Sequence, residues 1–312
     1  EEGNLVAFSG PDFKATFDKQ SGLLTSYLYK KHEYILNGQG PRPFFWRAPT
    51  DNDYGANLPV RLKAWKEASY QEPKAESFQV TPGSNATTVK VTYRFPQTYA
   101  RWDITYKIYA SGIIKVDNRF MAEGDQAPMI PRVGLRMQLP ESFTDLTYYG
   151  RGPKENYRDR RTSQFIGEYA IPVKDMYEPY VRPQENNHRT DIYWCALTDK
   201  TQRGLLLIAD RTFELNASNY PLESMDSGDT IDNGAPRTEK THHRHLTDPL
   251  PEKMVDLFID YRMMGVGGDD SWGATAHEPY LIRPGKENAI EYGFTLVPFD
   301  KKEDYKYLIR QY

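Results

Sequence analysis

The sequence is nearly devoid of cysteine, since Cys195 is the single one among 312 residues. This excludes an internal disulfide and a multi-cysteine metal cluster, although it does not decide between a secreted and an intracellular protein. No run of about 18 apolar residues is present that could cross a bilayer as a helix. The formal net charge is only −3, so the chain has no global field that would attract nucleic acid or an anionic membrane. We expect neither as a partner.

Several familiar motifs are also missing. No glycine-rich phosphate loop follows a strand, and there is no Gly-x-Ser-x-Gly elbow and no cysteine–histidine pairing. Internal repeats and low-complexity segments are absent. The chain opens on Glu1 and Glu2 without an initiator methionine or the basic and apolar regions of a signal peptide, so we expect this start to be a cut.

Aromatic residues, in contrast, are plentiful at 13%, and tyrosine alone contributes 23 residues. Tyrosine is favoured on half-buried sheets and on wet binding surfaces, which points to β structure and polar ligands. Alternating β-branched and aromatic residues predict strands at 13–18, 23–29, 77–81, 87–95, 101–110, 113–121, 191–198, 204–209, 213–217, 254–263, 280–282 and 289–297.

Helical periodicity is confined to one short segment near residues 58–70, where Leu58, Leu62 and Trp65 share a face and Pro59 lies in the first turn. Residues 141–191 are rich in proline, glycine and charge, which predicts loops, and the polar stretch 222–240 predicts an exposed loop with one helical turn. No change in composition marks a domain boundary. The sequence therefore predicts an all-β fold, a large antiparallel sandwich that spans residues 1–312 as a single domain.

The most unusual segment is a glycine-rich turn at residues 265–272, which we call the glycine turn; it carries two adjacent carboxylates and ends on Trp272. Its glycines permit positive φ angles, and its polar side chains can hydrogen-bond to nearby amides and stiffen the loop. A tryptophan ring held on a stiff loop can stack on a pyranose face. The alternative is that Trp272 folds back into the core as an anchor.

Adjacent carboxylates do not meet the needs of glycoside hydrolysis, because the two groups must flank the bond at about 5–10 Å. A structural role in fixing the loop is the better interpretation of this pair. We assign no catalytic residue in this chain. The residues expected to support the loop are Gly267, Gly268, Asp269, Asp270 and Ser271.

A second polar segment, Asp51-Asn52-Asp53 followed by Gly55, precedes the predicted helix as an ordered loop. Its side chains can cap that helix, coordinate a hard cation or reach a sugar, and capping or turn fixation is the interpretation we favour.

The six histidines offer little evidence for a metal. His243 and His245 would share a strand face as metal ligands do, but a third ligand at a recognisable spacing is missing, so no metal site is predicted. An acid–base sugar epimerase needs a histidine and a glutamate that face one sugar, and His188 with Glu185, or the 243/245 pair, are the candidates.

Two further loops, at 150–160 and 179–187, mix turn residues with charge and aromatic rings. Arg158, Asp159 and Arg160 can form an ion-pair network that braces a long loop, or an interface to another domain.

Five sequence islands together resemble the C-terminal domain of β-galactosidases of the lactose-operon type in glycoside hydrolase family 2. Each is weak alone, but their order and spacing cover nearly the whole chain. They are residues 45–53, 152–157, 175–181 with 183–186, 243–246 and 267–272.

The resemblance implies a many-stranded β-supersandwich similar in fold to galactose mutarotases, either the last domain of a long polypeptide or a small subunit. It also implies that both catalytic glutamates of a retaining mechanism lie on a barrel outside this chain, so the chain alone should not hydrolyse glycosides. Trp272 matches the tryptophan that completes the sugar site by stacking on the substrate. The segment that begins at Gly55 matches a mobile loop beside that site, but the stretch up to Trp65 is shorter here than in the lactose-operon enzymes.

The expected partners are β-galactoside sugars and the remaining domains or large subunit of the enzyme, which we expect to be oligomeric. No cofactor is expected in this chain, and parent enzymes that use magnesium or sodium ions would hold them elsewhere. Bacterial cytoplasm and periplasm both stay open as the location. Two alternatives also stay open: a free-standing carbohydrate-binding module and a mutarotase-like sugar epimerase.

Overall fold

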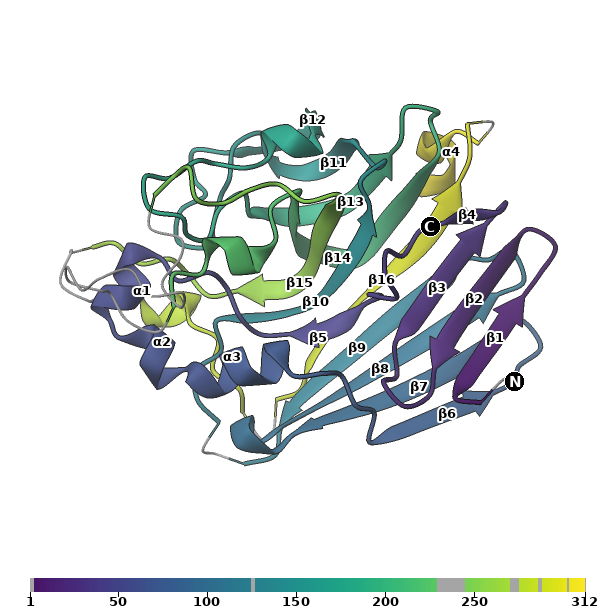
Figure 1. Ribbon diagram of the computed structural model, residues 1–312, viewed down its shortest axis with the longest axis horizontal. Coiled ribbons are helices and arrows are strands. Elements are labelled where there is room, and N and C mark those ends of the chain that lie inside the picture. The colour runs from purple at the N-terminus through teal and green to yellow at the C-terminus, as the bar shows by residue number, and fades with distance from the viewer. Residues whose placement is uncertain are drawn as a thin grey trace.

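The computed structural model describes residues 3–124, 127–228, 245–269, 275–285, 288–301 and 303–311. The described residues form two antiparallel sheets, with the short helices of residues 51–70 at one end and the helix of residues 305–309 near the C-terminus (Figure 1). The smaller sheet has four strands in chain order: β1 (Leu5–Ser9), β2 (Phe13–Asp18), β3 (Leu24–Tyr29) and β4 (His32–Glu33).

The larger sheet has twelve strands. Its main path runs β12 (Phe165–Pro172), β11 (Asp145–Gly152), β13 (Arg189–Thr198), β14 (Gly204–Ser218), β16 (Ile290–Phe299), β9 (Ile114–Ala122), β8 (Ala100–Tyr109), β7 (Ala86–Phe95) and β6 (Ser77–Thr81). Strand β14 is 15 residues long and pairs with β13, β16 and β15, so the sheet branches there. The branch contains β15 (Met254–Met263), β10 (Arg132–Pro140) and β5 (Arg42–Phe44).

The two sheets pack face to face through aromatic side chains. Phe17 of β2 contacts Tyr106 of β8 with ring centroids 5.1 Å apart, in an edge-to-face arrangement that aromatic pairs favour. The hydroxyl of Tyr27 donates to the Gly112 carbonyl in the turn between β8 and β9. A continuous buried cluster extends from the small sheet through the helices to β16. The mostly antiparallel all-β prediction is therefore confirmed.

The helical prediction is wrong in detail. The chain from 51 to 70 forms α1 (Asp51–Gly55), α2 (Leu58–Arg61) and α3 (Lys63–Tyr70), and a further helix, α4 (Tyr305–Ile309), lies near the end of the chain. The single helix expected at 58–70 is broken at Leu62, whose φ of −112° and ψ of 17° lie outside the helical range. The Trp65 ring is buried and packs against the Phe45 ring, with the ring centroids 4.8 Å apart.

Strand predictions for 77–81 and 254–263 match the structure, but three others do not. Residues 278–280 form a 3₁₀ helix instead of contributing to a strand at 280–282, and the two strands expected at 204–209 and 213–217 are one, β14. Strands β11 and β12 lie within the segment expected to be loops, and β10 was not predicted. Other 3₁₀ turns are Pro96–Thr98, Val173–Asp175 and Leu222–Met225.

Candidate functional site

The glycine turn follows β15, and the structure describes it up to Asp269. Asp270, Ser271 and Trp272 lie outside the described residues, as does His243. Gly267 and Gly268 have φ angles of 70° and 111°, which glycine adopts readily and other residues avoid. The turn thus uses its glycines as the sequence predicts.

Asp159 holds the backbone of this turn from a distant loop. Its Oδ1 accepts from the Val266 amide at 3.0 Å and its Oδ2 from the Gly267 amide at 2.8 Å. A Cβ on Gly265 would lie 2.6 Å from Asp159 Oδ2, so only glycine there allows the carboxylate to approach. Hydrogen bonds to an ionised carboxylate are stronger than those between neutral groups. One side chain therefore fixes two consecutive amides.

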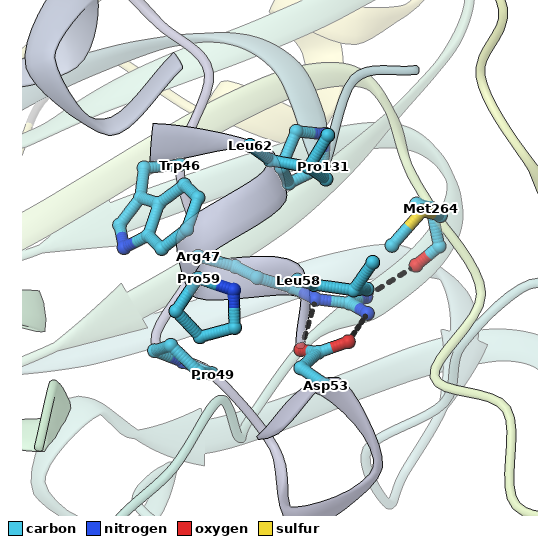
Figure 2. Close-up of a pocket in the computed structure, with 9 residues that line it drawn as sticks. All are labelled: Trp46, Arg47, Pro49, Asp53, Leu58, Pro59, Leu62, Pro131 and Met264. Carbon is cyan, nitrogen blue, oxygen red and sulfur yellow. Dashed lines mark hydrogen bonds and ion pairs between the residues drawn. The ribbon is translucent and has the colours of Figure 1, made fainter. Parts of the chain in front are cut away.

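Arg47 holds the carbonyl side of the same segment. Its Nη1 donates to the Met264 carbonyl at 2.5 Å and its Nη2 to the Gly265 carbonyl at 3.1 Å. The guanidinium also makes a two-pronged ion pair with Asp53, at 2.7 and 3.0 Å, as Figure 2 shows. Burial alone would lower the pKa of Arg47, but the Asp53 carboxylate raises it above its ordinary value. The cation stays charged where it binds the turn.

Helix α1 makes a third contact with the glycine turn. Thr50 and Asp53 form a capping box in which each side chain bonds to the other residue's backbone amide. Asp53 therefore has a capping role, but in α1, to which it belongs, and not in the helix predicted at 58–70. Asn52 donates from Nδ2 to the Val266 carbonyl at 3.0 Å. Asp51 is exposed and lies 3.4 Å from Arg182, and Gly55 is the last residue of the helix. The segment predicted as a loop beside the site is therefore a helix against the glycine turn.

The space between α1, α2 and the turn is filled. The cavity bounded by Trp46, Asp53 and Met264 measures about 10 Å³, which is room for one water molecule at most (Figure 2). This contact is packing and not a ligand pocket.

Asp269 continues the turn at the surface, where its carboxylate forms an ion pair with His277. The hydrogen bond and charge of Asp269 raise the pKa of His277. Both side chains are 65% exposed, so salt and solvent weaken the pair. Asp269 therefore links the two ends of the segment 269–277.

Comparison with known proteins agrees with this picture. Residues 9–296 match the family described as beta galactosidase small chain. The chain belongs to this family. Its resemblance to the C-terminal region of β-galactosidases is thus confirmed.

Relatives of this small-chain domain are longer proteins. A β-galactosidase of Priestia megaterium is 34% identical over 277 residues, which cover 89% of this chain and 25% of that protein. A β-galactosidase of Lactobacillus delbrueckii subsp. bulgaricus is 32% identical over 279 residues, 89% of this chain and 26% of that protein. The chain spans about a quarter of the length of these relatives.

Among solved structures, galactose 1-epimerase from Lactobacillus acidophilus NCFM superposes with a TM-score of 0.51 at 8% sequence identity, over 95% of this chain and 98% of that chain. At this identity the likeness concerns the fold alone. It confirms the mutarotase-like fold expected from the family.

A buried polar network lies next to the end of β15. His188 is fully buried, with Nε2 2.9 Å from Glu214 Oε2 and Nδ1 2.7 Å from Asn216 Oδ1. Glu214 also accepts from the Met263 amide at 2.6 Å, just before the glycine turn. Burial would raise the pKa of Glu214, but hydrogen bonding to His188 and nearby cations lower it. The network fixes the end of β15.

The epimerase candidates are therefore not arranged as an open acid–base pair. Glu185 is 4% exposed and accepts from Asn216 Nδ2 at 2.9 Å, so it belongs to the same buried network as His188. His245 is exposed. Within the described ranges, no group of three histidine, cysteine, aspartate or glutamate residues is placed to hold a metal ion. The helices of those ranges are all too short or too polar to cross a bilayer.

Arg158, Asp159 and Arg160 do form ion pairs and hydrogen bonds, but with partners outside their own loop or elsewhere in it, and not with one another. Arg158 pairs with Glu214 and Arg160 with Glu155, whereas Asp159 binds the glycine turn. No role for Arg47 was predicted from the sequence, although its position next to aromatic residues and prolines was a detectable signal. The other missed residues are charged groups inside apolar strands: Arg132, Glu214 and Asp260.

Proposed function

We propose that this chain is a non-catalytic part of a β-galactosidase, which completes a galactoside-binding site formed mainly by the rest of the enzyme. Trp272 would stack on the sugar, and the catalytic glutamates would lie outside this chain. One observation carries the proposal: Asp159, Arg47 and Asn52, from two segments far apart in the sequence, hold the backbone at 264–267, which precedes Trp272. Such ordering of a surface turn suits a rigid binding element.

Membership of the small-chain family supports association with a large chain or with the remaining domains. We include in the proposal that residues 1–312 act as one domain, because a single buried cluster connects both sheets. The buried state of His188 and Glu185 speaks against the epimerase alternative, since neither side chain faces a space open to a sugar.

The test uses the full β-galactosidase that contains this chain. Trp272→Ala should weaken galactoside binding by roughly 5- to 150-fold, equivalent to about 1–3 kcal/mol for a lost aromatic contact. Trp272→Phe should recover part of that loss, because it restores an aromatic ring. Tyr149→Ala, on the exposed face of β11, is the matched control and should leave the KM unchanged.

Two results would count against the proposal. One is an unchanged KM in Trp272→Ala. The other is galactoside hydrolysis by purified residues 1–312, which should show none. Measurable galactoside affinity of the isolated chain, lost with Trp272→Ala, would instead support the carbohydrate-binding module.

A further inference from the structure

A cleft of about 1070 Å³ lies on the large sheet. Its floor is formed by β7, β8, β9, β16, β14 and β15, and residues 281–283 and 288–289 form one wall. Five arginines line it: Arg119, Arg158, Arg211, Arg262 and Arg283. We call it the arginine cleft. Its volume is at or above the roughly 300–1,000 Å³ of ordinary small-molecule sites, which suits a ligand of several units.

Two carboxylates that line the floor, Asp117 and Asp210, are neutralised by lysines. Lys107 and Lys115 lie 3.3 and 3.1 Å from the carboxylate of Asp117, and Lys115 also pairs with Asp210. The Lys115, Asp117 and Asp210 side chains meet over Gly293, where an added Cβ would lie 2.4 Å from Asp210 Oδ2 and 2.5 Å from Lys115 Nζ. The glycine makes room for these ion pairs, which have little net charge to offer a ligand.

The arginines are not all neutralised in this way. Arg119 pairs with Glu291, Arg158 with Glu214 and Arg283 with Glu278. Arg211 and Arg262, on the neighbouring strands β14 and β15, have no carboxylate at ion-pair distance among the described residues. Two guanidinium groups therefore remain available to an anion.

The surroundings of Arg262 are a second, independent indication that the cleft binds a ligand. Its guanidinium lies over the Tyr261 ring, 5.3 Å from the centroid, and its Nε is shielded from solvent without a hydrogen-bond acceptor among the described residues. A shielded donor left unpaired is costly, so an acceptor supplied by a ligand would be favourable. Tyr261 and Tyr292 add aromatic surface to the same cleft.

We propose that the arginine cleft binds an oligosaccharide that carries carboxylate groups, such as a chain of uronic acids. A guanidinium group is planar and can donate two parallel hydrogen bonds to one carboxylate. Arg211 and Arg262 would therefore bind the carboxylates of the oligosaccharide. Tyrosine rings and the paired polar groups of the floor suit the apolar faces and hydroxyls of the sugar rings. This inference is independent of the galactoside site, which involves different residues.

The experiment is calorimetric titration of the chain with trigalacturonate and with its methyl ester, which has the same rings but no carboxylates. Trigalacturonate should bind, and the ester at least tenfold more weakly. Arg211→Ala and Arg262→Ala should each weaken trigalacturonate binding at least tenfold, whereas Arg94→Ala, an exposed arginine that does not line the cleft, should not. Arg262→Lys, which keeps the charge but loses the fork, should bind more weakly than the parent.

Equal binding of acid and ester, or no binding of trigalacturonate at millimolar concentration, would overturn the proposal. So would equal binding of tripolyphosphate, which would mean that the cleft attracts any polyanion. Binding by the isolated chain but not by the full β-galactosidase would show that another part of the enzyme occupies the cleft, and would also overturn it. Trp272→Ala should leave trigalacturonate binding unchanged, which separates this test from that of the galactoside site.

Discussion

Replacing Asp159 should loosen the glycine turn without unfolding the protein. In Asp159→Ala the Val266 and Gly267 amides lose both acceptors, and a hydrogen bond to a charged group contributes about 1.5 kcal/mol at the lower end of its range. Two such bonds make local opening easier by about 3 kcal/mol, which corresponds to roughly 150-fold faster amide exchange. Asp159→Asn keeps one neutral acceptor and should lose about 2 kcal/mol, or roughly 30-fold.

Hydrogen exchange of the isolated chain, followed at the Val266 and Gly267 amides, measures this effect directly. Asp12→Asn, at an exposed residue of the β1–β2 turn, is the matched control and should leave exchange at both amides unchanged. If exchange in Asp159→Ala rises less than threefold, the carboxylate does not hold the turn and the structural basis of the proposed sugar site is wrong.

Three further changes test the surroundings of the turn. Arg47→Met leaves Asp53 buried without its partner and should destabilise the protein by about 3–5 kcal/mol in urea unfolding; a loss below 1 kcal/mol would contradict a buried ion pair. Gly134→Ala places a Cβ 1.7 Å from Asp260 Oδ1 and should cost about 3 kcal/mol or prevent folding, and a stable variant would refute this contact. Burial raises the pKa of the Asp260 carboxyl to about 7, although the positive charge of Arg132 opposes this shift. The folded state therefore keeps a proton on Asp260 that the unfolded state loses near pH 4. The parent should therefore lose up to about 4 kcal/mol between pH 4 and pH 7, and Asp260→Asn should abolish that loss; identical pH profiles would show that Asp260 is ionised throughout.

Local patterns predicted much of the fold. The strands at 77–81 and 254–263 could be predicted from their β-branched and aromatic residues, although the strand at 254–263 is buried on both faces. Strand β10 is also buried on both faces, but it could not be predicted because it carries Arg132 and Arg136 at buried positions. Those arginines look like surface residues until Asp260 and Asp256 are known to lie opposite them.

In the candidate site, too, some features could be predicted from the sequence and others could not. The glycines and Trp272 stand out in the sequence because their residue types are unusual at that spacing. The role of Asp159 was not predictable, because its bonds to the turn join residues 107 and 108 positions apart. Sequence proximity instead suggested a pairing of Asp159 with its neighbouring arginines, which the structure does not show.

The long reach of the contacts on the glycine turn has a consequence for folding. Arg47 lies 217 residues before Met264, and Asp159 lies 107 residues before Val266, so the turn gains its hydrogen bonds only when both earlier segments are in place. Contacts this far apart in sequence form late, because the entropy of closing the intervening loops must be overcome first. The ordered turn is therefore a marker of completed folding. A chain synthesised from its N-terminus could not order this turn until nearly all of the domain had left the ribosome.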